Sequence, residues 1–340
     1  MVIRRTLHAA KAGVETAQLI QGATPNIVVW SSGLAKLRYY APEVETDAAP
    51  LLLVTPIINR YRIVDLKPEG SLVASLVARG IPVYVTDWGE PRRIDASTDW
   101  ETYVLRWLPE MAALVAASHE REQVDVLGYC LGGTLSIMFA ARFPNMVRRL
   151  ATLAAPVDFS VEDDYMPLLR QWVDPGHFPV ERLTRAFGNM PGRLIMQGFL
   201  WQKPMDTLLK PVNAWKRFDD LDFARLFGAL ESWNTDNVDV PGATYRRLIQ
   251  DLYRDNLLFK GEFLLRGQAV DLSRITCPVL VITMHKDTTC PPSAALALLD
   301  KVSSTRKERL DLKGGHVTPV VSSRGRGDMH DPLADWLLQD

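Results

Sequence analysis

The sequence is poor in cysteine and has almost no excess of either charge. Its three cysteines, Cys130, Cys277 and Cys290, are spread along 340 residues without the spacing of a disulfide framework or of a metal site. We therefore expect a reducing, cytoplasmic environment and no bound metal. Lys and Arg number 39 and Asp and Glu 40, a net charge of -1, which removes the strongest electrostatic reason to expect a nucleic acid partner.

Long apolar runs are also lacking. The longest, APLLLVTPII at residues 49–58, is far shorter than the roughly 20 apolar residues needed to cross a bilayer, so no transmembrane segment is expected. Hydrophobic residues nevertheless make up 47% of the chain, enough to bury a large core. At this length the composition predicts one domain with a large insertion, or two domains.

Short apolar segments alternate with helical ones from about residue 50. LLLVTP, SLVASLVARG and IPVYVTDWG have the pattern of strand, helix and strand, with Gly80 ending the helix. A helix over 99–118, the strand VDVLG, the helix GTLSIMFAARFP and the strand LATLAAP follow. Strands that are apolar throughout and separated by helices predict an α/β fold with a mostly parallel sheet covered on both faces. Residues 1–40 have the pattern of a helical lead-in.

Residues 161–265 interrupt this alternation with aromatic-rich, helix-like segments. Strand patterns return in CPVLVIT and ERLDLKGGH, before a last helix, DPLADWLLQD. We predict an α/β core formed by residues 1–160 and 266–340 and a helical cap subdomain at 161–265. The cap is interpreted either as a lid over the active site or as a helical subdomain with a core of its own.

One short stretch carries the chemistry. Gly128-Tyr129-Cys130-Leu131-Gly132 has the spacing of the nucleophile elbow G-x-S-x-G, with cysteine in place of serine. The flanking glycines are expected because larger side chains would collide with the strand or the helix around this tight turn. The following helix directs its positive N-terminal end at the sulfur and so favours the thiolate, and the Leu131 N–H is the expected first oxyanion donor.

An acid and a base follow in the order expected for an elbow enzyme. Asp287 ends the segment VLVITMHKD and His316 follows LDLKGG, both at the carboxyl ends of strands, where open α/β sheets place their sites. His316 is expected to deprotonate Cys130, and Asp287 to orient His316 and stabilise its charged form. A second oxyanion N–H is expected in the loop after LLLVTP, at Ile57 or Ile58.

The remaining cysteines and histidines have simpler interpretations. Cys277 and Cys290 are expected to be packing residues. His285, two residues before Asp287, is the competing candidate for the base, but its place at the edge of a strand favours a structural role. Packing does not explain Cys130, because it gives no reason for the glycines on both sides. Four histidines in polar surroundings are expected to be solvated: His8, His119, His177 and His330.

A cysteine at the elbow also bears on the kind of reaction. Serine would form an oxygen ester, and a thioester substrate would lose its activation in that step. Cysteine forms another thioester by a nearly isoenergetic exchange, so the acyl group stays activated. We therefore hypothesise a transferase that passes its acyl group to a weak nucleophile such as an alcohol.

The segments around these residues resemble the catalytic subunit of polyhydroxyalkanoate synthases, of the short class III or the related class IV. The resemblance runs from about residue 50 to the C-terminus and is carried by PLLLVTPIINRYRIVDL, SLVASLVARGIPVYVTDWG, VDVLGYCLGGT, LATLAAPVDF, DLSRITCPVLVI and GGH. It implies an α/β-hydrolase fold with a cap, and a 3-hydroxyacyl-coenzyme A substrate such as 3-hydroxybutyryl-coenzyme A, with coenzyme A released as a polyester grows. It further implies that Cys130 carries the acyl group, with Asp287 as acid and His316 as base. No cofactor is implied, since coenzyme A is part of the substrate and a product.

The sequence departs from this family beside the expected site. The usual D-H-x-V-P-P run is here DTTCPP, with Thr288 after the aspartate, and G-G-H-x-G becomes GGHVT followed by the basic loop SSRGRGD. Both changes leave the three triad residues in place. Arg324 and Arg326 in the basic loop, and Arg60 beside the oxyanion loop, are candidate contacts for the coenzyme A phosphates, with solvated surface charges as the alternative.

The resemblance also implies partners and a location. A homodimer, a separate accessory synthase subunit and a place on the surface of polyester granules are expected. About 50 residues precede the first expected core strand, so the long N-terminal domain of class I synthases is not expected. Two alternatives stay open: a hydrolase, either a thioesterase or a depolymerase, that uses water as acceptor, and a non-catalytic granule-associated protein with an unreactive Cys130.

Overall fold

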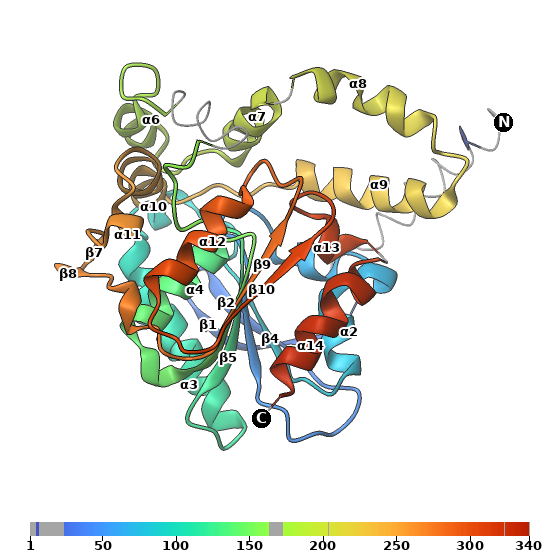
Figure 1. Cartoon of the computed structure of the whole chain (residues 1–340). Helices are drawn as coiled ribbons and strands as arrows, with labels where there is room; N and C mark the ends of the chain where they lie inside the picture. The colour runs from blue at the N-terminus through green and yellow to red at the C-terminus, as the bar shows by residue number, and fades with distance from the viewer. Residues whose placement is uncertain (1–4, 7–23, 163–172, 203, 323, 340) are drawn as a thin grey trace.

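An eight-stranded sheet forms the centre of the computed structural model, which describes residues 5–6, 24–162, 173–202, 204–322 and 324–339 (Figure 1). The strand order is β1-β2-β4-β3-β5-β6-β9-β10. Strands β4, β3, β5, β6, β9 and β10 pair in parallel, while β1 and β2 are antiparallel at one edge. The strand bounds are β1 Ile27–Ser32, β2 Ala35–Tyr40, β3 Leu51–Val54, β4 Val83–Asp87, β5 Val124–Tyr129, β6 Val147–Leu153, β9 Val279–Met284 and β10 Lys307–Leu312.

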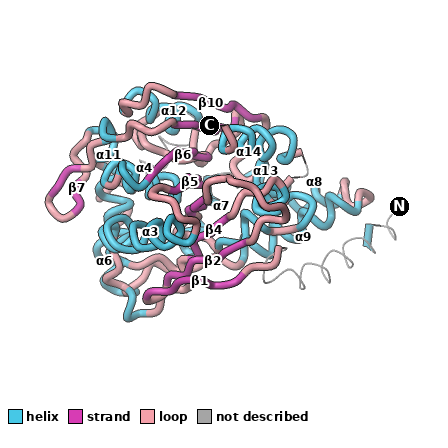
Figure 2. Tube along the Cα trace, turned by 90° about the horizontal axis from the view of Figure 1, so that it is seen from below, coloured by secondary structure: helices cyan, strands magenta, loops and turns pink. Residues whose placement is uncertain are grey.

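Helices cover both faces of this sheet, as the apolar strand patterns predict. Strands β3 and β5 are buried along their whole length, which requires cover on either side. Helices α3, α4 and α12 lie on one side and α2 and α14 on the other (Figures 1 and 2). Their bounds are α2 Leu72–Ala78, α3 Leu108–Ser118, α4 Leu131–Arg142, α12 Pro292–Lys301 and α14 Asp331–Leu337, and a short helix, α13, spans Thr318–Val321. The fold is therefore the predicted α/β-hydrolase architecture.

The expected helical lead-in is wrong for residues 27–40, which form the β1–β2 hairpin. The segments IVVWSS and AKLRYY are rich in β-branched and aromatic residues, which favour strands. Gly33, with a φ of +60°, lies in the turn between them. The sheet therefore begins at Ile27 and not near residue 50, and most of the lead-in before residue 24 lies outside the described residues.

The segment between β6 and β9 is mainly helical. It contains α6 Val180–Phe187, α7 Gly192–Gln202, α8 Pro204–Trp215, α9 Leu221–Thr235, α10 Gly242–Arg247 and α11 Leu257–Lys260, with a small hairpin, β7 Leu264–Leu265 and β8 Gln268–Ala269. Helices α8 and α9 lie beyond the carboxyl ends of the sheet strands (Figure 1). This is the segment predicted as a cap, and the division into core and cap stays a prediction.

Short helices of other kinds connect the main elements. The 3₁₀ helices are η1 Tyr61–Asp65, η2 Pro68–Gly70, η3 Arg93–Asp95, η5 Pro144–Met146 and η7 Leu272–Arg274, and the π-helices are η4 Thr102–Trp107, η6 Leu248–Arg254 and η8 Arg326–His330. The single helix expected at 99–118 is thus a π-helical segment that continues into α3. Its Trp107 packs against Trp88, which follows β4, and the centroids of their two rings lie 6.2 Å apart.

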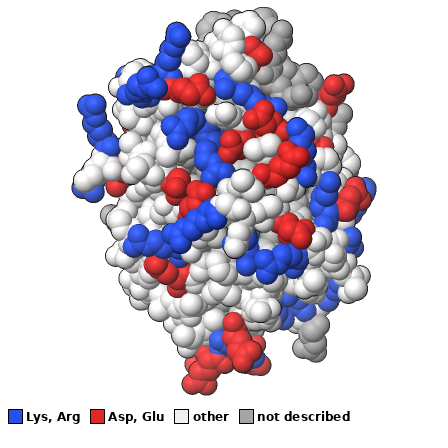
Figure 3. Space-filling view, turned by 90° about the vertical axis from the view of Figure 1, so that its left-hand side faces the viewer, with Lys and Arg blue, Asp and Glu red and all other residues white. Residues whose placement is uncertain are grey.

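The surface carries both charges. On the face shown in Figure 3, basic and acidic side chains are interspersed. None of the helices in the described ranges combines the length and the apolar composition needed to span a bilayer.

Candidate active site

Cys130 lies in a strained turn between β5 and α4. Its φ of +54° and ψ of -128° are unusual for a residue with a side chain. The backbone is fixed on both sides: the Cys130 N–H donates to the Leu153 carbonyl at 2.9 Å, and the Cys130 carbonyl accepts from the N–H groups of Gly133 and Thr134. The residue is 8% exposed. The turn therefore holds the sulfur at the carboxyl edge of the sheet, at the N-terminal end of α4.

Both glycines of the motif are needed for close packing. A Cβ atom on Gly128 would lie 2.4 Å from the Cα of Gly133, and one on Gly132 would lie 2.2 Å from the Val54 carbonyl oxygen. Side chains do not fit at such distances, and the atoms in the way belong to the backbone. The start of α4 therefore packs directly against the end of β3. The predicted oxyanion loop begins at this end of β3.

The predicted acid and base lie together at the same edge of the sheet. Asp287 follows β9 and His316 follows β10, and the His316 Nδ1 lies 2.7 Å from the Asp287 Oδ2. Asp287 is fully buried, and its Oδ1 accepts from the N–H groups of Thr289 and Cys290, both at 2.9 Å. Its two oxygens are therefore fixed, one by the backbone and one by the imidazole.

His316 also interacts with Cys130. Burial lowers the pKa of His316, but the charges of Asp287 and Cys130 and hydrogen bonds to both raise it to about 10. With Nδ1 bonded to Asp287, Nε2 is the ring nitrogen left to exchange a proton with the Cys130 sulfur. The structure thus brings Cys130, Asp287 and His316 together, and their catalytic roles stay a prediction.

Tyr129, for which the sequence indicated no role in the site, holds His316 in place. The Tyr129 ring stacks on the imidazole, and its hydroxyl donates to the His316 carbonyl at 3.2 Å.

His330 hydrogen-bonds the Pro319 carbonyl at 2.7 Å through Nε2 and the Ser75 hydroxyl at 2.8 Å through Nδ1. The expectation that His330 is solvated is wrong, since it is 1% exposed and burial lowers its pKa. It fixes α13, the helix that follows His316.

The predicted oxyanion loop follows β3 and rests on the end of β4. The Trp88 indole N–H donates to the Thr55 carbonyl at 2.8 Å, and the Thr55 N–H donates to the Thr86 hydroxyl at 2.9 Å. Ile57 and Ile58 come next and are buried. The Leu131 amide belongs to the first turn of α4, where amides have no intrahelical acceptor. The amides of Leu131 and of Ile57 or Ile58 remain the predicted donors.

The three arginines predicted as substrate contacts differ in their surroundings. Arg60 forms ion pairs with Asp236, at 2.7 Å, and with Glu90, at 3.3 Å, so its charge is neutralised in this conformation. Arg324 and Arg326 are exposed on the surface past His316. Contacts with coenzyme A stay a prediction for all three.

The other residues considered for the site, Cys290, Cys277 and His285, differ in burial. Cys290 is buried, and burial together with the charges of Asp287 and Cys130 raises its pKa well above the usual range. Cys277 is partly buried, and burial raises its pKa to about 11. His285 is exposed, and the hydrogen bond to Asp287 comes from His316 instead.

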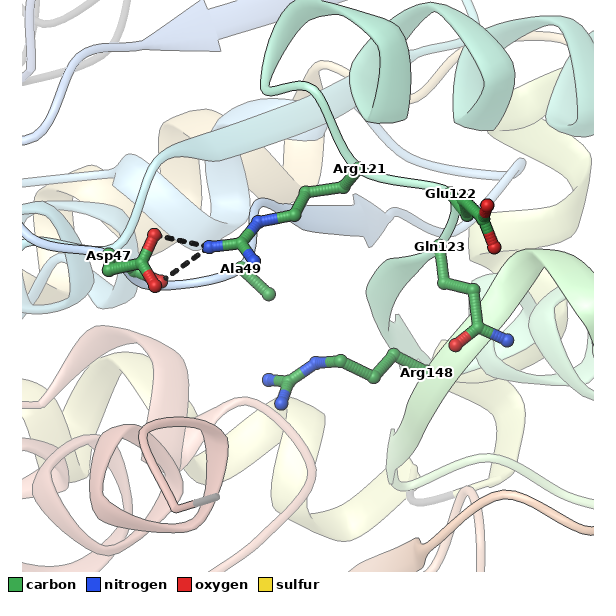
Figure 4. A pocket seen from close by; sticks show the side chains of 6 residues that line it. All are labelled: Asp47, Ala49, Arg121, Glu122, Gln123 and Arg148. Carbon is green, nitrogen blue, oxygen red and sulfur yellow. Dashed lines mark hydrogen bonds and ion pairs between the residues drawn. The ribbon is translucent and has the colours of Figure 1, made fainter.

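A separate hollow of about 280 Å³ lies at the opposite end of the sheet. The residues that line it precede β3 and β5 or lie at the start of β6 (Figure 4): Asp47, Ala49, Arg121, Glu122, Gln123 and Arg148. Arg121 is paired with Asp47, and Arg148 with the buried Asp125. Within the described part of the chain, no group of three or more His, Cys, Asp or Glu side chains is placed to hold a metal ion.

A cysteine elbow on this sheet, with a paired Asp and His, defines an α/β-hydrolase-type protein, and comparisons with known proteins narrow the class. A family model described as alpha/beta hydrolase fold matches residues 66–322. A second, described as the poly-beta-hydroxybutyrate polymerase (PhaC) N-terminus, matches residues 11–76. The sequence motifs suggested that the family similarity starts at about residue 50. The second family model shows that it begins well before that residue.

Curated proteins of similar sequence indicate the same family as the second model. The chain is 34% identical over 340 residues to the poly(3-hydroxyalkanoate) polymerase subunit PhaC of Haloferax mediterranei, covering 99% of this chain and 68% of that protein. The chain is 35% identical over 320 residues to the protein of the same name from Allochromatium vinosum, covering 93% of this chain and 89% of that protein. The chain therefore belongs to the poly(3-hydroxyalkanoate) polymerase family, within the α/β-hydrolase superfamily.

Solved structures agree on the fold. MenH from S. aureus superposes with a TM-score of 0.57 at 14% identity, covering 89% of this chain and 99% of that one. A membrane phospholipase A superposes with a TM-score of 0.55 at 16% identity, covering 99% of this chain and 93% of that one. At these identities the likeness shows the fold alone.

Proposed function

We propose that this chain is an acyltransferase that polymerises 3-hydroxyacyl groups from their coenzyme A thioesters, with the growing acyl group held as a thioester on Cys130. The observation that supports this most directly is the linkage of Asp287, His316 and Cys130 at the carboxyl edge of the sheet. Membership of the polymerase family supports the choice of substrate. A short acyl group such as 3-hydroxybutyryl is the proposed monomer.

In the first half-reaction, His316 holds the Cys130 proton and the Cys130 thiolate attacks the substrate carbonyl. The oxygen of the tetrahedral intermediate accepts hydrogen bonds from the Leu131 amide and from that of Ile57 or Ile58. As the carbon–sulfur bond to coenzyme A breaks, the His316 proton passes to the leaving thiolate. Coenzyme A leaves as a thiol, and the acyl group remains on Cys130.

In the second half-reaction, the 3-hydroxyl group of an incoming 3-hydroxyacyl-coenzyme A attacks the Cys130 thioester. His316 takes the hydroxyl proton as the new carbon–oxygen bond forms, and returns it to the Cys130 sulfur as the carbon–sulfur bond breaks. The lengthened chain is then a coenzyme A thioester, and the first half-reaction returns it to Cys130 and releases coenzyme A. Each cycle therefore adds one ester bond and releases one coenzyme A. The thioester on cysteine keeps the acyl group activated enough for an alcohol to be the acceptor.

The segment at 161–265 is proposed to shield this acyl-enzyme from water. The position of this segment supports the proposal, because α8 and α9 lie beyond the edge of the sheet at which Cys130 is held. Exclusion of water matters because hydrolysis competes with transfer to an alcohol for the same intermediate. A homodimer, an accessory subunit and attachment to polyester granules complete the proposal.

Product analysis separates a polymerase from a hydrolase. Purified protein is incubated with 3-hydroxybutyryl-coenzyme A, and the products are fractionated into soluble acid and insoluble polyester. Polyester together with free coenzyme A is the expected result. Free 3-hydroxy acid without polyester would identify a hydrolase instead. Full processive activity of the chain without any second polypeptide would contradict the accessory subunit.

A further inference from the structure

The residues that follow the predicted oxyanion loop are bonded to the end of α9. Asp236, directly after α9, forms ion pairs with Arg60, at 2.7 Å, and with Arg62. Both guanidinium groups lie at the C-terminal end of a 15-residue helix, where the helix dipole favours positive charge. The Arg62 side chain is only 12% exposed, so this pairing is partly shielded from water.

Two hydrogen bonds flank the ion pairs. The Asn59 side-chain amide donates to the Asn237 Oδ1 at 2.7 Å, and the Trp233 indole N–H donates to the Arg60 carbonyl at 3.2 Å. Trp233 is 7% exposed, so its indole is held by packing as well. We call these contacts between residues 59–62 and 233–237 the α9 latch.

The α9 latch lies next to the amides that the reaction requires. Asn59 alone separates Ile58 from Arg60 in the chain. On the other side of the two isoleucines, the Thr55 carbonyl is held by Trp88. The loop is therefore anchored to the sheet before Ile57 and to the end of α9 after Ile58, and the direction of its amides depends on both anchors.

We propose that Asp236 is a positioning residue for the oxyanion loop. Through Arg60 and Arg62 it holds the Ile57 and Ile58 amides in the direction that the oxyanion needs, while touching no reacting atom itself. The oxyanion hole is then complete only when the end of α9 is bonded to residues 59–62. The kinetic consequence rests on the proposed function, whereas the physical coupling does not.

Hydrogen exchange tests the coupling without any assumption about the reaction. Full-length Asp236→Ala is compared with wild type and with Asp222→Ala, which removes an exposed ion pair with Arg225 from the same helix. Amide exchange of residues 55–62 is expected to be faster in Asp236→Ala and unchanged in Asp222→Ala. Asp236→Asn, which keeps the shape of the side chain, is expected to lie between, and it replaces Asp236→Ala if that variant does not fold. Unchanged exchange in the Asp236 variants would overturn the proposal.

Two rates of Cys130 then test the consequence. Single-turnover acylation by saturating 3-hydroxybutyryl-coenzyme A uses the oxyanion hole, whereas alkylation by iodoacetamide uses only the thiolate. In Asp236→Ala the acylation rate is expected to fall by up to about 100-fold, the loss that a misplacement of about 1 Å at a reacting centre causes, with alkylation unchanged. Unchanged acylation, or an equal loss in both rates, would contradict the positioning role. A wild-type protein that is never acylated would refute the proposed function, and hydrogen exchange would still decide the role of Asp236.

Discussion

Tyr129 lies with its ring stacked on the imidazole of His316, with the two centroids 5.5 Å apart and the planes inclined by 29°. Because its hydroxyl also donates to the His316 carbonyl, one buried side chain holds both the ring and the backbone of the predicted base. The residue adjacent to the nucleophile in the chain thus positions its proton acceptor.

This contact predicts graded effects at position 129. Tyr129→Phe keeps the stacking and loses one buried hydrogen bond, so the free energy of unfolding should fall by about 1 kcal/mol with a small loss of kcat. Tyr129→Leu also removes the stacking and should lower kcat further with little change in KM. Tyr40→Phe is the control, because the buried Tyr40 hydroxyl has no hydrogen-bond partner among the described residues. A kcat of Tyr129→Leu equal to that of wild type would contradict this role.

The raised pKa of His316 predicts a pH dependence of stability. Its pKa of about 10 lies above the value of about 6.5 for an unperturbed histidine, so the protonated ring stabilises the folded state. That contribution is complete below about pH 6.5 and is lost as the pH rises through about 10. Urea denaturation at several pH values should show unfolding free energy falling more steeply over this range in wild type than in His316→Gln. Equal slopes would show that His316 is not coupled to Asp287 and Cys130.

The indole N–H of Trp88 is predicted to matter because it holds the Thr55 carbonyl. Trp88→Phe leaves this buried carbonyl without its donor and should slow single-turnover acylation of Cys130. Trp107→Phe is a matched control, because the Trp107 indole N–H is buried with no partner in the described part of the chain, and its ring stacks on Trp88. The Trp107 variant should lose packing but keep the acylation rate. Equal rates in the two variants would argue against an anchor at Thr55.

Gly132 is predicted to tolerate no side chain. In Gly132→Ala the new Cβ would meet the Val54 and Thr55 carbonyl oxygens at 2.2 and 2.5 Å, so α4 must move away from β3. Activity should be lost and the unfolding midpoint lowered. Gly198→Ala, inside α7 and with no atom within 4 Å of its Cβ position, should be stabilised by up to about 1 kcal/mol. An active Gly132→Ala enzyme would disprove the close packing at the elbow.

The parts of the molecule that the sequence predicted are those with a local signature. The elbow is a five-residue pattern, and Asp287 and His316 follow strand patterns whose carboxyl ends must meet in a parallel sheet. The β1–β2 hairpin also had a signature, two β-rich segments around Gly33, and was missed in favour of a helix.

Other parts have no local signature. The contacts of the α9 latch join residues 173 to 178 positions apart, such as Trp233 with Arg60 and Asn59 with Asn237. Nothing in either segment of the sequence indicates the other. The burial of His330 is likewise set by tertiary packing, because its two partners lie on α13 and on α2. Contacts of this kind depend on how elements pack and become visible only in the folded chain.

The central claim is that the Cys130 sulfur carries the acyl group as a thioester. Its most direct test is rapid mixing with 3-hydroxybutyryl-coenzyme A, an acid quench, and mass analysis of the peptide that contains Cys130. We predict a 3-hydroxyacyl adduct on this peptide that forms as coenzyme A is released, and neither adduct nor release in Cys130→Ala. Release of coenzyme A by Cys130→Ala at the wild-type rate, or an adduct found only on another residue, would contradict the account.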